Sequence, residues 1–274
     1  MRVLVTGATG TVGRHVVDGL LRSGASVRAL TRSPETAGLP GEVEVVRGDL
    51  TAPESVEPAL ADVDRLYLFP VPETAEAVMR LAGKAGVRRV VVLSSVSAGY
   101  AEGDLSGDQH RAVEVAVEAS GIEWTHVRPG EFMANLLFLW APFVQAEGVV
   151  RAPYGDAESA MVHEADIADV AVRALVEDGH AGEQYPLTGP EALTKVEQVR
   201  IIGEVLGRDV RFEELTKEQT RELWISQGMP AEAVDWLLTP PPPKATVGPT
   251  SEQVTGRPAR TFAQWVADHR ADFS

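Results

Sequence analysis

The sequence predicts an α/β fold built on a doubly wound parallel sheet, with a smaller, mostly helical C-terminal subdomain. Short runs rich in Val and Leu alternate with segments of helical periodicity, which is the pattern of parallel βαβ units. The run Val90-Val91-Val92-Leu93 is apolar at every position, as expected of a strand that is covered on both faces. Glycines at positions 7, 10 and 13 separate the first apolar run from the first helical segment. Together these features indicate a Rossmann-type sheet.

The same alternation gives the order of the elements. Strands are expected where apolar and β-branched residues concentrate, at residues 2–6, 26–31, 43–47, 65–69, 89–94, 123–128 and 184–188. Helices are expected between them, at residues 12–23, 55–60, 74–85, 109–119 and 166–176.

After Thr188 the alternation fades. The rest of the chain is expected to form helices at residues 196–206 and 217–227 and a closing helix at 261–272, which presents Phe262, Trp265 and Val266 on one face. We therefore predict a first domain at residues 1–188 and a smaller subdomain at 189–274.

The run Pro240-Pro241-Pro242-Pro243 is predicted to be a stiff polyproline II spacer, because each proline lacks an N–H and has a fixed φ angle. The alternative is a ligand for an SH3-like partner.

Charge and composition restrict the partners. The chain has 274 residues, with 25 Lys and Arg against 40 Asp and Glu, and a formal net charge of −15. Binding to nucleic acid or to an anionic membrane rests on clustered basic residues, so neither partner is expected. No Cys is present and the His residues lack metal-ligand spacing, so no disulfide or metal site is expected. Without a signal peptide or an apolar run of about 20 residues, we expect a cytoplasmic protein.

The glycine-rich segment is the strongest local signal. Gly7 permits a tight turn, Gly10 allows the backbone to approach a pyrophosphate, and Gly13 lets the helix pack closely on the sheet. The following helix N-terminus presents free N–H groups to phosphate, with Thr9, Thr11 and Val12 beside it. We predict dinucleotide binding here; the alternative is a purely structural turn.

The residue after the second strand indicates which dinucleotide binds. A site that prefers NAD carries an acidic residue there to hold the ribose 2′-hydroxyl, but this sequence has Thr31-Arg32-Ser33. The Arg32 guanidinium suits a 2′-phosphate, so we predict NADP(H). The alternative is that Arg32 is a solvated charge at a strand end.

Further cofactor contacts are expected where other strands end. Asp49 and Leu50 follow the third strand and are predicted to face the adenine; the alternative is a merely polar strand end. Phe69-Pro70 follows the fourth strand and is predicted to form a rigid wall over the middle of the cofactor. Ser94 and Ser95 end the fifth strand, at the carboxyl edge where open α/β sheets bind ligands.

Several segments carry motifs beyond the glycine turn and Arg32. They are Gly48-Asp49-Leu50, Ser94-Ser95-Val96-Ser97-Ala98, Ser120 to Thr125, Val127-Arg128-Pro129-Gly130, His163 to Ala168 and Thr255-Gly256-Arg257-Pro258. Spread over nearly the whole chain, they resemble the NmrA-like family of atypical short-chain dehydrogenase/reductases. The resemblance implies NADP(H) binding, with Pro129 in the cofactor site. It leaves the reaction open, because the family includes quinone reductases and catalytically silent NADP-sensing regulators.

The catalytic motif departs from that of active short-chain dehydrogenases. Alignment places Ser106 and His110 where those enzymes have the Tyr and Lys of Tyr-x-x-x-Lys. His110 is therefore a candidate to bind the nicotinamide ribose or to deliver a proton, since an unperturbed His titrates near neutral pH. Tyr100 is a second candidate proton donor. The alternative for His110 is a histidine that merely lies on a helix surface.

An apolar segment follows the sixth strand, and we expect residues 131–159 to contribute to the substrate cleft. Within it, Phe132, Met133, Trp140 and Phe143 are predicted to bind a flat, apolar or aromatic substrate. The alternative is that they are ordinary core residues.

The hypothesis from sequence is an NADPH-dependent reductase that transfers hydride to an apolar conjugated carbonyl, quinone-like or aromatic acceptor, in a monomer or homodimer. The protein need only align the two reactants and exclude water. The alternatives are a non-catalytic NADP(H)-sensing regulatory protein, favoured by the missing Tyr-Lys pair, and a non-redox isomerase or dehydratase.

Overall fold

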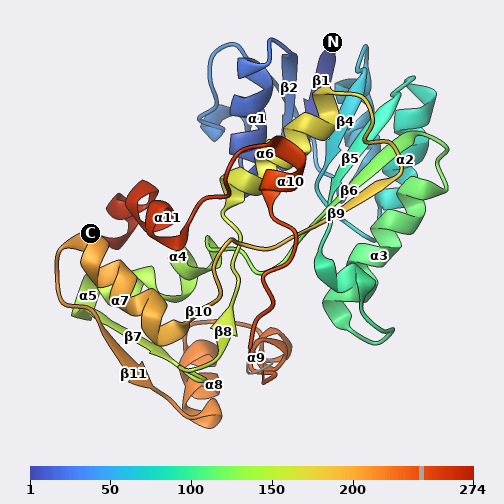
Figure 1. Ribbon diagram of the computed structural model, residues 1–274. Helices are drawn as coiled ribbons and strands as arrows, with labels where there is room; N and C mark the ends of the chain where they lie inside the picture. Colours follow the sequence, from blue (N-terminus) through green and yellow to red (C-terminus); the bar gives the residue numbers. More distant parts are fainter. Residues whose placement is uncertain (241–243) are drawn as a thin grey trace. The chain divides into compact units, whose positions relative to one another are not determined.

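Seven parallel strands form the main sheet, in the order β3-β2-β1-β4-β5-β6-β9 (Figure 1). Their bounds are β1 Arg2–Val5, β2 Ser26–Thr31, β3 Glu44–Arg47, β4 Arg65–Leu68, β5 Arg89–Leu93, β6 Glu123–Pro129 and β9 Glu183–Leu187. The strand order reverses between β1 and β4, and ligands of doubly wound sheets bind at the carboxyl ends of the strands beside such a switch point. The predicted fold class and the expected order of these strands are confirmed.

Helices cover both faces of this sheet (Figure 1). They are α1 Thr11–Arg22, α2 Ala75–Lys84, α3 Leu105–Glu118, α6 Glu164–Val176 and the short α10 Ser251–Thr255. One core, which lies beneath α2 and α3, includes Leu66, Val90 and Val92 from alternate positions of the central strands.

Two expected helices of this region differ from the structure. In place of the helix expected at residues 55–60, the chain forms two 3₁₀ turns, Pro53–Ser55 and Glu57–Leu60. Pro53 and Pro58 lack the N–H groups that an α-helix needs for its hydrogen bonds. The helix expected at 109–119 begins earlier, at Leu105, since the Asp104 carboxylate caps it by accepting the Gly107 N–H at 2.6 Å.

The computed structural model describes residues 1–240 and 244–274, which group into two compact units. Unit 1 comprises Met1–Gly130, Glu164–Leu187 and Pro249–Pro258, and unit 2 comprises Glu131–His163, Thr188–Gly248 and Ala259–Ser274. The chain passes from unit 1 to unit 2 at Leu187–Thr188, beside the domain boundary that the sequence predicts. It also passes between the units at further points. Most of the expected proline spacer, at 241–243, lies outside the described residues.

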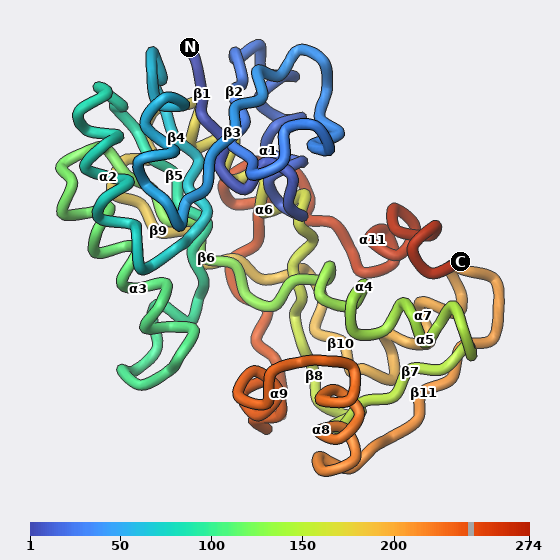
Figure 2. The backbone as a smooth tube through the Cα atoms, turned by 180° about the vertical axis from the view of Figure 1, so that it is seen from behind, coloured from blue at the N-terminus to red at the C-terminus, as the bar shows by residue number. Residues whose placement is uncertain are grey.

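Unit 2 is built from short elements. Its helices are α4 Asn135–Leu139, α5 Ala141–Glu147, α7 Lys195–Leu206, α8 Lys217–Ser226, α9 Ala231–Leu237 and α11 Phe262–Asp268. Two small sheets were not expected from sequence: β7 (Val149–Ala152) pairs in parallel with β11 (Arg211–Glu214), and β8 (Glu158–Ser159) pairs antiparallel with β10 (Leu193–Thr194) (Figure 2). Such short strands carry too few residues to display a period of two.

The core of unit 2 is aromatic. Phe262, Trp265 and Val266 of α11 are buried together, as the sequence predicted, and Trp140 and Phe273 join the same cluster. The closing helix is shorter than expected, because a 3₁₀ turn at Arg270–Phe273 follows α11. No helix in the part of the chain that the structure describes is long and apolar enough to span a membrane.

Candidate cofactor and active site

The turn between β1 and α1 requires glycine at positions 7 and 13. Gly7 has a φ of +61°, and its carbonyl oxygen accepts the Gly10 N–H at 2.9 Å, which closes the turn. A Cβ at Gly13 would lie 2.0 Å from the Gly7 carbonyl oxygen, so only glycine permits this approach of helix to turn.

The N-terminus of α1 is open to an anion. Gly10 provides no side-chain cap and the first turn holds no acidic residue, whereas Asp104 caps α3 and Thr194 caps α7. Free N–H groups of a first helical turn, at the positive end of the helix dipole, bind phosphate. The turn therefore fits the pyrophosphate that the sequence predicts.

Two arginines that the sequence analysis did not single out order the segment after β2. Arg14 of α1 donates to the carbonyl oxygens of Thr9 at 3.1 Å, Ala37 at 3.0 Å and Gly38 at 3.1 Å. Arg47 of β3 donates to the Arg32 carbonyl at 2.6 Å and forms an ion pair with Glu35. These contacts fix the backbone on both sides of the glycine turn and around Arg32.

Arg32 itself is exposed, and its guanidinium has no hydrogen-bond or ion-pair partner among the described residues. Asp49 is close enough for its pKa to feel the Arg32 charge, although the bond from the Thr51 N–H, at 2.9 Å, is what mainly lowers that pKa. A free cation at the end of β2 is the group that a ribose 2′-phosphate requires.

The ends of β1 and β4 are joined by Thr6. Its hydroxyl donates to the Tyr67 carbonyl at 3.0 Å and accepts the Phe69 N–H at 2.8 Å. Phe69 is 44% exposed, and its side chain lies beside Gly7 of the turn. Leu50 and Phe69 line the same shallow surface groove. This groove is lined by Leu50, Leu68, Phe69, Val71, Thr74, Ala75 and Val78. Leu50, which is predicted to face the adenine, and Phe69 of the predicted rigid wall thus lie together. Pro70 directly follows Phe69 in the chain.

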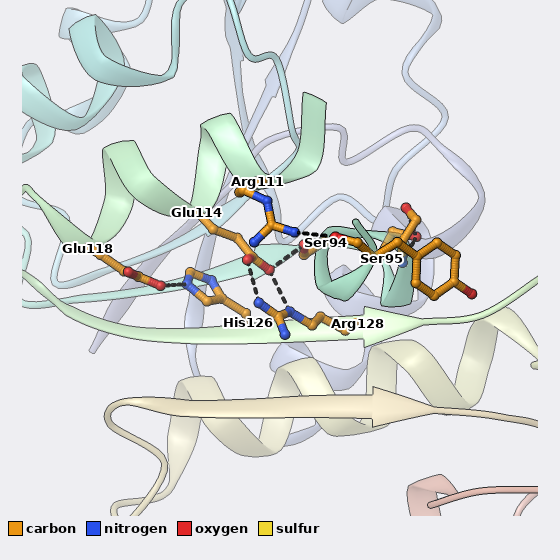
Figure 3. A network of polar contacts seen from close by, with 9 residues as sticks. Ser94, Ser95, Arg111, Glu114, Glu118, His126 and Arg128 are labelled. Atoms are coloured by element: carbon orange, nitrogen blue, oxygen red, sulfur yellow. Dashed lines mark hydrogen bonds and ion pairs between the residues drawn. The ribbon is translucent and has the colours of Figure 1, made fainter. Parts of the chain in front are cut away.

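A buried ion pair fixes α3 to the strands β5 and β6 (Figure 3). The Glu114 carboxylate, 3% exposed, accepts from Arg128 Nε at 2.8 Å and Nη2 at 2.6 Å, and from the Ser94 hydroxyl at 2.6 Å. Burial alone would raise the pKa of Glu114, but these hydrogen bonds hold it below its usual value. The Ser94 hydroxyl is therefore committed to Glu114, which leaves Ser95 as the serine with the more accessible hydroxyl.

Next to this ion pair, hydroxyl groups connect Ser95 to His110. The Ser97 hydroxyl donates to Ser95 Oγ at 2.9 Å and lies 3.2 Å from Ser106 Oγ. His110 Nδ1 lies 2.8 Å from the Ser106 carbonyl oxygen and 3.5 Å from its Oγ. Tyr100, the other candidate proton donor, is 56% exposed on the turn before α3.

All predicted cofactor residues lie in unit 1, at or after the carboxyl ends of β1 to β6, at the start of α1, or on α3. The parallel sheet gathers the strand ends at one edge. The four predicted substrate residues lie in unit 2. Met133 and Trp140 are buried in its aromatic core, at 2% and 3% exposure, which agrees with the alternative that they are ordinary core residues. Phe132 and Phe143 are half-buried. In the described part of the chain, no cluster of His, Asp and Glu side chains could hold a metal ion.

Comparisons with known proteins identify the family to which the chain belongs. Residues 7–178 match the NAD(P)H-binding family. The chain is 42% identical to the (4-alkanoyl-5-oxo-2,5-dihydrofuran-3-yl)methyl phosphate reductase of Streptomyces griseus, over 99% of each chain. It is 35% identical to the NAD(P)H azoreductase of Xenophilus azovorans, also over 99% of each chain. The solved NADPH-dependent quinone oxidoreductase of Escherichia coli superposes with a TM-score of 0.82 at 27% identity and covers 98% of this chain and 99% of that one.

The class is that of NAD(P)H-dependent oxidoreductases. The chain belongs to the NAD(P)H-binding family, and the resemblance to its NmrA-like members, drawn from the motifs, is confirmed. The expectation of an enzyme is confirmed as well.

Proposed function

We propose that this chain is an NADPH-dependent reductase that transfers hydride to an acceptor whose carbonyl group is conjugated with a carbon–carbon double bond. The observation that carries the proposal is the uncapped N-terminus of α1 on its glycine turn, with the unpartnered Arg32 guanidinium at the end of the adjacent β2.

Each part of the cofactor has a fitting group in unit 1. The N–H groups at the start of α1 bind the pyrophosphate, and Arg32 binds the 2′-phosphate by charge-assisted hydrogen bonds. Leu50 would cover the adenine and Phe69 the middle of the cofactor, with Asp49 as a hydrogen-bond acceptor. Ser95, His110 and Pro129, at the ends of β5 and β6 and on α3, would contact the nicotinamide end. When bound, NADPH supplies the hydride.

The acceptor class follows from two kinds of support. The reductase with 42% identity is named for a 5-oxo-2,5-dihydrofuran, and the E. coli structure is named for quinones; both groups contain a conjugated carbonyl. Phe132 and Phe143 are half-buried aromatic residues suited to a flat apolar ring. A conjugated acceptor needs only hydride and a proton, so the absence of Tyr-x-x-x-Lys is compatible with its reduction.

The test combines the purified protein with NADPH, or separately with NADH, and a panel of unsaturated lactones, quinones and azo dyes, while nicotinamide absorbance is followed. We expect acceptor-dependent oxidation that is faster with NADPH. Oxidation with none of the unsaturated lactones and quinones, or with azo dyes alone, would overturn the proposal, and equal rates with NADH would overturn the NADPH preference.

A further inference from the structure

The hydroxyl groups between β5 and α3 have a fixed direction of hydrogen bonding. A carbonyl oxygen only accepts, so the 2.8 Å contact with the Ser106 carbonyl requires a hydrogen on His110 Nδ1. The Ser97 hydrogen is used in the bond to Ser95 Oγ, so the 3.2 Å contact between Ser106 and Ser97 has Ser106 as its donor. The hydrogens of Ser106 and Ser97 therefore both point toward Ser95. The Nδ1 hydrogen of His110 is held by the Ser106 carbonyl, beside the Ser106 hydroxyl.

Ser95 ends this series with a free proton. Its Oγ accepts from the Ser97 hydroxyl at 2.9 Å and from the Ser97 N–H at 3.2 Å, and it donates to no group among the described residues. Ser97 is 5% exposed, whereas Ser95 is half-buried at the carboxyl end of β5. The inner hydroxyl is thus shielded from water and the terminal one remains accessible.

The approach of α3 to this strand end is built into the fold. A Cβ at Gly107 would lie 2.4 Å from the Ser97 carbonyl oxygen, so only glycine allows the start of α3 to pack this closely. Two turns further along α3, the Glu114 ion pair with Arg128 and the bond from Ser94 hold the helix against β5 and β6. Ser106 and His110 lie between these two fixed points.

We propose that His110, Ser106, Ser97 and Ser95 form a proton relay whose terminal hydroxyl, on Ser95, protonates the acceptor. The relay rests on the proposed function and supplies the proton donor that it lacks. Ser97 and Ser106 thereby become positioning residues that act through Ser95.

The protons balance along the series. The acceptor gains two electrons and one hydrogen as hydride from the cofactor, and its negative oxygen takes the Ser95 proton. Ser97 reprotonates Ser95, Ser106 reprotonates Ser97, and His110 gives its Nδ1 proton to Ser106 while its Nε2 takes a proton from solvent. Proton exchange with solvent then removes the Nε2 hydrogen and returns one to Nδ1. The 3.5 Å contact between His110 Nδ1 and Ser106 Oγ is the longest link, and it must shorten during transfer.

The relay is tested with Ser97→Ala and Ser106→Ala, with Ser106→Thr as the variant that restores a hydroxyl. We expect kcat to fall by about 10²-fold in both alanine variants, in line with the contribution of a positioned proton donor. Ser106→Thr should regain most of the rate. The Kd for NADPH, measured by fluorescence in the absence of acceptor, should stay unchanged. The matched control is Ser23→Ala, which removes a hydroxyl that bonds only to Leu20 at the end of α1.

Nitrogen NMR of the imidazole rings in the unliganded protein gives a second readout. The relay requires neutral His110 to carry its hydrogen on Nδ1, and the opposite tautomer would overturn the proposed direction. Wild-type rates in both alanine variants, or a loss confined to Tyr100→Phe, would overturn the relay while the proposed function stands. A wild-type protein inactive toward every acceptor would end both proposals.

Discussion

The two ends of the sheet edge in unit 1 are built by different means. At β1 and β2 the site consists of backbone: a glycine turn, unbonded amides of α1 and one exposed guanidinium. At β5 and β6 it consists of side chains: a buried ion pair and a series of hydroxyl groups that hold α3 in place.

The difference matches the two tasks proposed for them. A pyrophosphate is a fixed, symmetric anion that many N–H groups can hold, so the binding end depends on backbone shape. Proton transfer depends on the position of single atoms, so the other end depends on packed side chains with few alternative arrangements. Substitutions should therefore affect cofactor binding at one end, and stability or rate at the other.

The largest effect is expected for Glu114→Ala. Removal of Glu114 leaves the Arg128 charge, whose side chain is only 16% exposed, without its partner, which should lower the free energy of unfolding by about 3 kcal/mol or more. Urea unfolding followed by circular dichroism measures the change. The control is Glu204→Ala, which breaks the exposed ion pair with Arg200 and should cost at most about 0.5 kcal/mol. Similar losses in both variants would contradict the distinction between the buried and the exposed pair.

The same carboxylate predicts a pH dependence. Its pKa is lower in the folded protein than in the unfolded chain, so its stabilising contribution is fully present above the unfolded pKa. The contribution is lost as the pH falls through the folded pKa. Unfolding measured over an acid pH series should show the gap between wild type and Glu114→Gln narrowing toward low pH. A gap that stays constant would contradict the assignment.

Gly13→Ala should be the most damaging change at the backbone end. The added methyl would meet the Gly7 carbonyl oxygen at 2.0 Å, and relief of that clash should cost about 3 kcal/mol and displace the turn from the phosphates. Thermal unfolding with and without NADPH tests both effects. Gly83→Ala is the matched control, because nothing lies within 4 Å of its Cβ on α2 and the change should stabilise that helix by about 0.5–1 kcal/mol.

Arg32→Ala should have the smallest effect on the fold and a selective effect on binding. A lost charged hydrogen bond of about 1.5–3 kcal/mol corresponds to NADPH affinity weakened by roughly 10- to 100-fold. Affinity for NADH, which lacks the 2′-phosphate, should barely change. Titration calorimetry with both cofactors measures the ratio, and equal losses for both would remove Arg32 from the 2′-phosphate site.

The sequence predicted unit 1 better than unit 2 for a physical reason. The strand β5 is buried along its whole length, so Val90 to Leu93 form a continuous apolar run that the sequence reveals. Glycines likewise indicate the turn before α1. In unit 2, strands of two to four residues and helices such as α4 Asn135–Leu139 are stabilised by packing around Trp265 and Trp140, which local periodicity does not record.

By itself, the sequence determined the fold class, the glycine turn and the identity of the residues that end each strand, because these depend on spacing along the chain. Only the tertiary structure decided which of those residues meet. Arg14 reaches carbonyl groups 23 and 24 residues away, Ser94 gives its hydroxyl to Glu114, and Ser97 joins Ser106 because Gly107 lets α3 approach. Such contacts depend on how closely two elements pack, and a single sequence carries no direct signal of that distance.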